Sequence, residues 1–152
     1  MAVTDNTLLA DLEAIVGTGR VLNSSDDLQH YGRDWTTVHV AAPRLIVLPG
    51  TVMEVQEVVR YAAHHQLAIV PSGGRTGLSG GAVAASGELV LALDRMNKIS
   101  AYNAIDRTVC CEAGVITEQL QTYALEQGLF YPVDFASSGS SQIGGNIATN
   151  AG

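Results

Sequence analysis

Two short apolar runs, each ended by a proline, constrain the fold of this chain more than any other feature of its sequence. Residues 44–49 read RLIVLP and residues 67–71 read LAIVP. Unbroken apolar runs of this length predict β-strands that are covered on both faces of their sheet. Between them, Thr51 and Glu54 form a capping-box pattern ahead of apolar residues at helical spacing, which predicts a helix to about Gln66. A strand, a crossover helix and a second strand together predict that the two strands run parallel.

Two further helices are expected on either side of this unit. Apolar residues recur at helical spacing over residues 8–16, and Gly17 follows them directly. This helix would belong to a helical lead-in that covers residues 1–43. Farther along, Thr117 is expected to cap a helix that ends before Gly128.

Three short strands are expected between the parallel unit and the last of these helices. Polar turn residues at 97–98 and 106–107 look like hairpin turns, so we expect the strands to be antiparallel neighbours. The strands themselves are expected at residues 88–93, 99–103 and 108–113. A parallel β-α-β unit followed by an antiparallel mixed segment is an α+β fold.

The first glycine loop follows the second apolar run. Residues 71–81 read PSGGRTGLSGG and begin where a parallel strand ends, which is where open α/β sheets place their ligands. Glycines let consecutive N–H groups turn into an anion-binding concavity, to which Arg75, Thr76 and Ser79 can add donors. The loop contains neither a GxGxxG pattern nor the lysine of a P-loop, since Lys98 is the only lysine. The alternative is a flexible surface connection.

A second stretch rich in glycine, serine and asparagine covers residues 137–150, which read SSGSSQIGGNIATN. Ile143 and Ile147, together with the small residues around them, favour a backbone packed closely against another segment. The alternative is a serine-glycine linker. We therefore interpret the first stretch as a loop that fits a pyrophosphate, and the second as a segment packed closely against another part of the molecule.

Charge and composition exclude several other classes of protein. Eight basic and fifteen acidic residues give a net charge of −7, which argues against a partner that is nucleic acid or an anionic membrane surface. No apolar stretch approaches the roughly 18 residues of a membrane span, and Met1–Ala10 lacks the features of a secretory signal, so we expect a cytoplasmic location. Cys110 and Cys111 are adjacent, which suits neither a disulfide framework nor a metal site.

At the two glycine loops the chain resembles the FAD-binding domain of the vanillyl-alcohol oxidase and p-cresol methylhydroxylase superfamily. Within it the bacterial FAD-linked D-2-hydroxyacid dehydrogenases, of D-lactate, glycolate and D-2-hydroxyglutarate type, are most similar. The resemblance extends from Tyr31 to Gly152, and residues 132–152 most resemble the D-2-hydroxyglutarate group. It implies that residues 44–152 are the N-terminal part of an FAD-binding domain. Because the sequence stops inside the second loop, we expect a domain incomplete at its C-terminus, inactive alone.

The resemblance also implies roles for individual residues of the two loops. The first loop would hold the FAD pyrophosphate on backbone N–H groups, and the second would lie near the flavin ring and the ribityl chain. The implied cofactor-binding residues are Ser72, Gly73, Gly74, Arg75, Thr76, Gly77, Leu78, Gly80, Pro132, Asp134, Ser138, Gly144, Gly145, Asn146 and Thr149. Relatives that bind flavin covalently use a histidine in the first loop, and Arg75 and Thr76 stand here instead, so noncovalent FAD is expected. No catalytic residue and no metal ligand are assigned.

For the full-length protein the resemblance implies hydride transfer from a D-2-hydroxyacid to FAD, which yields the 2-oxoacid, with a protein or quinone as electron acceptor. The alternatives are an FAD-dependent oxidase or reductase of the same fold with another substrate, and a nucleotide-binding module without redox chemistry. Two neighbouring residues ahead of the first strand complete the expectations. Trp35, the lone tryptophan, is expected to anchor the core, and Asp34 resembles a recurrent position of the family.

Overall fold

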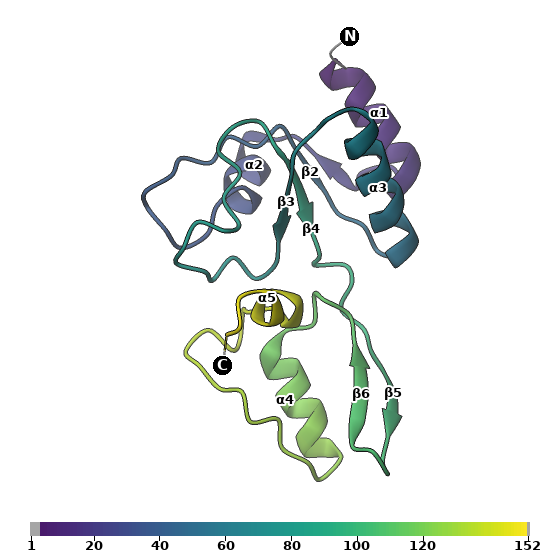
Figure 1. Cartoon of the computed structure of the whole chain (residues 1–152), viewed down its shortest axis with the longest axis vertical. Coiled ribbons are helices and arrows are strands. Elements are labelled where there is room, and N and C mark those ends of the chain that lie inside the picture. The colour runs from purple at the N-terminus through teal and green to yellow at the C-terminus, as the bar shows by residue number, and fades with distance from the viewer. Residues whose placement is uncertain (1–3, 152) are drawn as a thin grey trace.

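The computed structural model describes residues 4–151, in which a four-stranded sheet and a two-stranded sheet form the frame. The larger sheet has the strand order β1-β2-β4-β3, and the smaller one pairs β5 with β6 (Figure 1). The strands are β1 (Val21–Leu22), β2 (Leu45–Val47), β3 (Ile69–Ser72), β4 (Leu89–Ala92), β5 (Ile99–Asn103) and β6 (Thr108–Cys111). The helices are α1 (Asp5–Val16), α2 (Ser25–Tyr31), α3 (Val52–His64), α4 (Thr117–Glu126) and α5 (Ile143–Ala148).

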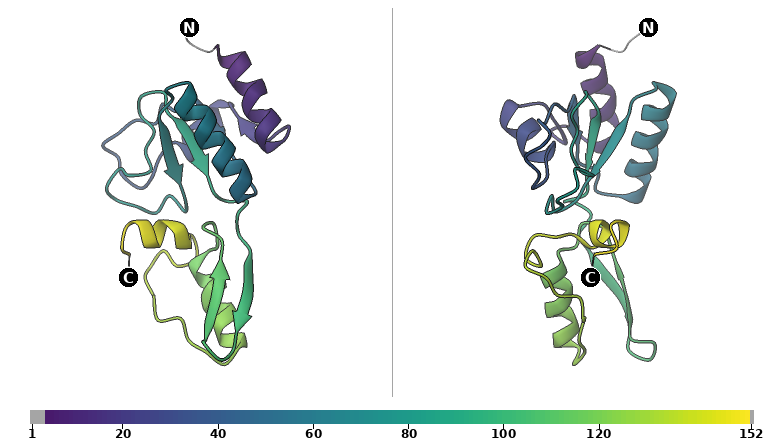
Figure 2. Two further views of the ribbon diagram at one scale, coloured as in Figure 1. Left: turned by 45° about the vertical axis from the view of Figure 1, so that its right-hand side comes forward. Right: turned by 60° about the vertical axis from the view of Figure 1, so that its left-hand side comes forward.

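Both faces of the larger sheet are covered, as the unbroken apolar runs predict. Leu45 and Val47 of β2 pack on one face with α1 and α3, whereas Ile46 points into a second cluster that includes residues of α2. The two helical layers lie on opposite sides of the sheet in Figure 2. The parallel strand–helix–strand unit and the α+β fold class are therefore confirmed.

The order of the strands departs from the expectation in one respect. The strand at 88–93 does not form a hairpin through residues 97–98 with the strand that follows. Instead β4 lies between β2 and β3 and runs parallel to both of them. Its all-apolar sequence LVLA is buried at every position, which suits a central strand and not half of an exposed hairpin. Pro71 is accommodated because β3 lies at the edge of the sheet.

The hairpin expected at residues 106–107 is present. Strands β5 and β6 pair antiparallel, with Asn103 opposite Thr108. Together with α4 and α5 they surround a separate small core of Val115, Leu120 and Ile143. The helix expected from Thr117 is α4, although Ile116 takes the N-cap position and the side chain of Thr117 is buried.

The residues before the first parallel strand share the core of the larger sheet. Leu8, Leu12 and Val16 of α1 are almost fully buried, and β1 pairs with β2. Helix α1 and strand β1 of the expected lead-in are thus packed against the segment that follows it, and the division at residue 44 stays a prediction. Within residues 4–151 no helix has the length and apolar character to cross a membrane.

Candidate functional site

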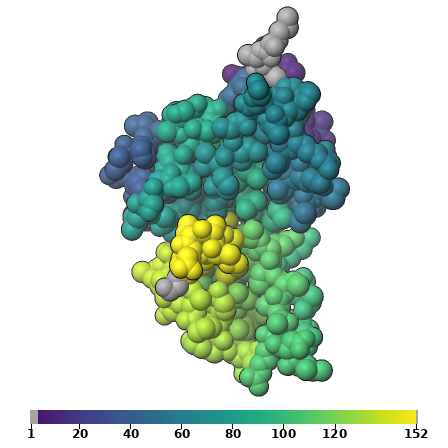
Figure 3. Space-filling model, in the orientation of Figure 1, coloured from purple at the N-terminus to yellow at the C-terminus, as the bar shows by residue number. Residues whose placement is uncertain are grey.

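The first glycine loop lies at the carboxyl edge of the larger sheet, facing the second glycine stretch. The loop begins directly after β3, and Asp94 lies just beyond the end of the neighbouring strand β4. Helix α5 lies just below this edge in Figure 1, and Figure 3 shows its residues packed at the junction between the two halves of the molecule. The topology therefore brings together two segments that are some sixty residues apart in the chain.

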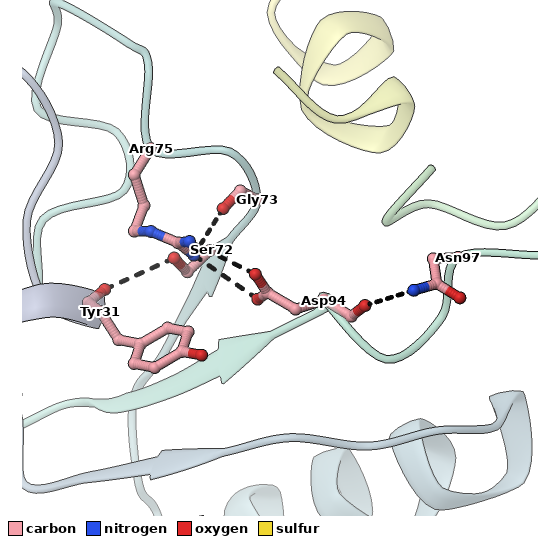
Figure 4. A network of polar contacts seen from close by, with 6 residues as sticks. All are labelled: Tyr31, Ser72, Gly73, Arg75, Asp94 and Asn97. Atoms are coloured by element: carbon pink, nitrogen blue, oxygen red, sulfur yellow. Dashed lines mark hydrogen bonds and ion pairs between the residues drawn. The ribbon is translucent and has the colours of Figure 1, made fainter. Parts of the chain in front are cut away.

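Arg75 fixes the shape of the first loop from within (Figure 4). Its Nη1 donates to the carbonyl of Gly73 at 2.8 Å, and its Nη2 lies 3.3 Å from Oδ1 of Asp94. The guanidinium also lies 4.8 Å from the ring centre of Tyr31. Burial, followed by the negative charge of Asp94, raises the pKa of Tyr31. Because the guanidinium already has three partners, its function in the loop is to hold the backbone.

Asp34 fixes the far end of the same loop. Its buried carboxylate accepts from the backbone N–H of Thr36 at 2.8 Å and from that of Gly80 at 3.0 Å. The N–H of Trp35 donates to the carbonyl of Gly77 at 3.0 Å. This assigns a structural role to Asp34, for which the sequence supplied only a resemblance. The aspartate ties the segment before the sheet to the glycine loop.

The middle of the first loop presents backbone N–H groups that have no partner. Within residues 4–151, none of the N–H groups of residues 74–79 donates to another backbone or side-chain atom. Arg75 has a positive φ of 59°, so the chain turns sharply here between two glycines. A row of unpaired N–H groups can bind an anion, because each one adds a partial positive charge.

The two glycine stretches touch through their backbones. A Cβ atom at Gly74 would collide with the carbonyl oxygen of Ser140 and would lie 2.8 Å from the Cα of Ser141. On the other side of this contact, Ser141 Oγ lies 2.7 Å from Thr117 Oγ1, to which Asn146 Nδ2 donates at 2.7 Å. This buried polar cluster holds the second stretch against α4. The serine-glycine linker and the flexible connection are therefore both wrong.

A cleft of about 630 Å³ opens where the two stretches meet the segment before the sheet. Gly74, Arg75 and Thr76 of the first stretch line it, and so does Gln142 of the second. The remaining lining residues are His30, Arg33, Asp34, Trp35, Thr36, Thr37, Asp94, Ile116 and Ser140. The unpaired N–H groups at residues 74–76 thus belong to residues that border a cavity large enough for part of a dinucleotide.

Residues 43–152 match the family model described as the FAD binding domain. The chain belongs to this FAD-binding family. It is 55% identical over 150 residues to D-2-hydroxyglutarate dehydrogenase of Stutzerimonas stutzeri, covering 99% of this chain and 32% of that protein. It is also 35% identical over 144 residues to the mitochondrial D-2-hydroxyglutarate dehydrogenase of Bos taurus, covering 95% of this chain and 26% of that protein. The chain spans about a third of the length of its bacterial relatives.

Solved structures place the FAD-binding domain in the expected superfamily. The structure of p-cresol methylhydroxylase with substrate bound has a TM-score of 0.80 and 28% identity, covering 96% of this chain and 29% of that one. Alkyldihydroxyacetonephosphate synthase, with a TM-score of 0.83 and 24% identity over 92% of this chain and 28% of its own, shows the fold alone. The resemblance read from the two loops is confirmed, and FAD is the cofactor of the domain.

The structure brings only some of the expected cofactor residues to the cleft. Gly74, Arg75 and Thr76 line it, and Ser72 and Gly73 lie directly before them. Asn146 is turned into the buried cluster with Thr117. The other expected residues lie outside the cleft lining: Gly77, Leu78, Gly80, Pro132, Asp134, Ser138, Gly144, Gly145 and Thr149. Gly152 is outside the described residues, and the roles of the whole set stay predictions.

Trp35 does not anchor the core, contrary to the expectation. Its side chain is 72% exposed and lines the cleft. Aliphatic side chains from α1, α2 and α3 already cover the two faces of the larger sheet, and the backbone of Trp35 is held at the loop by Gly77. The tryptophan is therefore part of the candidate site.

Sequence reasoning missed Asp94 and Gln142. A parallel assignment for the strand at 88–93 would have revealed Asp94, because the residue that follows that strand then reaches the ligand edge. Gln142 lies among small polar residues, and nothing in its spacing marks it. Its burial and its lack of a partner are visible only in the structure.

Proposed function

We propose that this chain holds FAD noncovalently in the cleft between its two glycine stretches, as part of an enzyme that oxidises a D-2-hydroxyacid to the 2-oxoacid. The observation that carries the FAD site is the row of unpaired N–H groups at residues 74–79. Support for the substrate class comes from the relatives, which are D-2-hydroxyglutarate dehydrogenases at 55% and 57% identity. Within this class D-2-hydroxyglutarate is the substrate we favour.

The residues around the cleft fit a pyrophosphate. Its charge would be met by the N–H groups of Gly74, Arg75 and Thr76, while the Arg75 side chain stays with Asp94. This arrangement lets an acidic protein bind an anion, because fixed backbone dipoles replace a cluster of free cations. The second stretch, residues 137–150, would border the rest of the cofactor.

When bound, FAD supplies a flavin ring that accepts a hydride from the carbon bearing the substrate hydroxyl. The part proposed for this chain is to bind and orient the cofactor. The loop is held at both ends, by Asp34 and by Arg75, so its N–H groups are in place before the ligand arrives. Electrons would pass onward to a protein or a quinone, and catalytic residues are not assigned to these 152 residues.

The test uses the protein expressed at its full natural length. We expect a yellow protein whose flavin absorbance bleaches anaerobically with D-2-hydroxyglutarate, with L-2-hydroxyglutarate as the control. D-lactate and glycolate, added separately, distinguish the members of the substrate class. Bleaching by none of these hydroxyacids would refute the dehydrogenase function but leave the FAD site standing. A colourless protein that takes up no added FAD would refute both.

The noncovalent attachment has its own test. After acid precipitation the yellow colour is expected in the supernatant, because no histidine occurs between residues 71 and 81. His30 lines the cleft and is the residue to examine if the colour stays with the pellet. In that case a His30→Ala variant that releases the colour would identify the covalent link.

A further inference from the structure

Gln142 is a buried amide that has no hydrogen-bond partner. The residue is 4% exposed, and its Oε1 atom accepts no hydrogen bond within the described part of the chain. Its side chain packs against the first glycine loop, where Oε1 would lie 3.3 Å from a Cβ atom at Gly73. A buried acceptor without a donor destabilises a folded protein, so such an atom calls for a physical explanation.

The unpaired amide belongs to the candidate site. Gln142 lines the same cleft as Gly74, Arg75 and Thr76, whose N–H groups are also unpaired. Thr36 borders the same cleft, and its buried Oγ1 also has no partner among the described residues. Two buried polar atoms without partners at one cavity indicate that a ligand completes their hydrogen bonding.

The chemistry of the unpaired atom limits which part of a ligand it can meet. A carbonyl oxygen accepts a hydrogen bond, and an ionised phosphate has no proton with which to donate one. In FAD the groups bonded to either end of the pyrophosphate are the ribityl chain and the ribose, and both carry hydroxyl donors. An acceptor placed beside an anion site would therefore meet a sugar hydroxyl.

We propose that Gln142 Oε1 accepts a hydrogen bond from a sugar-type hydroxyl of FAD next to the pyrophosphate. This rests on the FAD site proposed above and adds to it a binding residue of the second glycine stretch. In the free protein Oε1 of Gln142 has no hydrogen-bond donor. Part of the binding free energy of FAD therefore comes from the hydrogen bond that this atom gains. Thr36 Oγ1 is the second polar atom of the same subsite.

The experiment compares Gln142→Met with a matched control, Gln121→Met. Methionine keeps the length of the side chain and removes its polar atoms. Gln121 lies outside the cleft, and its Nε2 donates to the carbonyl of Val133 at 2.8 Å. Both variants are made in the protein at its full natural length. The apo forms are compared by thermal unfolding, and FAD affinity is measured by titration of the apo forms.

We expect opposite results from the two variants. Gln142→Met should raise the unfolding temperature of the apo form and weaken FAD binding about tenfold. Gln121→Met should lower the unfolding temperature and leave FAD affinity unchanged. ADP, tested as a competitor, locates the hydroxyl. ADP contains the ribose but not the ribityl chain. A larger inhibition constant for ADP in Gln142→Met than in the wild type therefore points to a ribose hydroxyl, and an unchanged constant points to the ribityl chain.

The result that overturns the inference is a Gln142→Met protein that binds FAD as tightly as the wild type. A lower apo unfolding temperature with unchanged affinity would make Gln142 a packing residue. If Gln142→Met does not fold, Thr36→Val tests the same subsite, and an unchanged FAD affinity there also contradicts the proposal. A wild-type protein that binds no FAD refutes the proposed site itself, which is a separate outcome.

Discussion

The contact between the two glycine stretches is the part of the site that a single substitution should disturb most. At Gly74 an added methyl group would meet the carbonyl oxygen of Ser140, the Cα of Ser141 at 2.8 Å and the carbonyl carbon of Ser140 at 2.9 Å. These are all backbone atoms, which cannot rotate away as a side chain could. Gly74 does not have a positive φ, so Gly74→Ala tests this contact without backbone strain.

The expected magnitude follows from the cost of overpacking, which is about 1–3 kcal/mol. A cost of about 2 kcal/mol would lower the unfolding temperature by about 6 °C for a chain of this size. If the two stretches separate to relieve the clash, FAD must close them again, and the same free energy weakens its binding about thirtyfold. The assays are thermal unfolding of the apo form and FAD titration.

Two other glycines serve as controls for Gly74→Ala. Gly81 lies in the same loop with open space around its Cα, so Gly81→Ala should change neither the unfolding temperature nor the FAD affinity. Gly128 lies outside the cleft lining and has a positive φ of 68°, which a side chain strains, so Gly128→Ala should destabilise the fold without changing FAD affinity. Wild-type stability and affinity in Gly74→Ala would refute the close apposition of the two stretches.

Two further predictions concern the anchors of the fold. Asp34→Ala should lower the free energy of unfolding by about 1–3 kcal/mol in urea titrations, because two backbone N–H groups lose their acceptor; an unchanged midpoint would contradict the anchoring role. Burial, the hydrogen bond to Asp11 and the charge of that carboxylate raise the pKa of Tyr61 to about 12, from 10.0 in the unfolded chain. The fold therefore favours the neutral hydroxyl, and this contribution is complete below pH 10 and is lost as the pH rises to 12. Tyr61→Phe should lose less stability than the wild type across that range, and parallel losses in the two proteins would contradict the assignment.

The elements that could be predicted from the sequence are those with a strong local signal. Residues 45–49 are apolar at consecutive positions, and Leu45–Val47 became β2, which is buried on both faces. The capping residues Thr51 and Glu54 marked the start of α3, and the structure shows the Thr51 cap. Hydrophobic pattern and capping act within a few residues, so one sequence is enough to find them.

The position of β4 could not be predicted in the same way. Its apolar run predicts a strand, but strand neighbours depend on which faces are free once the sheet assembles, and that is a long-range property. This one error also concealed Asp94, because a hairpin strand would not have ended at the ligand edge. Gln142 was missed for a related reason: its lack of a partner depends on every neighbouring segment being in place.

The way the first loop is held explains how its N–H groups remain available. The carbonyls of Ser72, Gly73 and Gly77 accept hydrogen bonds from Leu93, Arg75 and Trp35 respectively. The N–H groups of residues 74–79 have no partner in the described chain. Anchoring the loop through its carbonyl oxygens leaves the positive ends of its peptide dipoles to the ligand. In the proposed site the partners of the loop, and not the glycines alone, would therefore suit it to an anion in a protein whose net charge is −7.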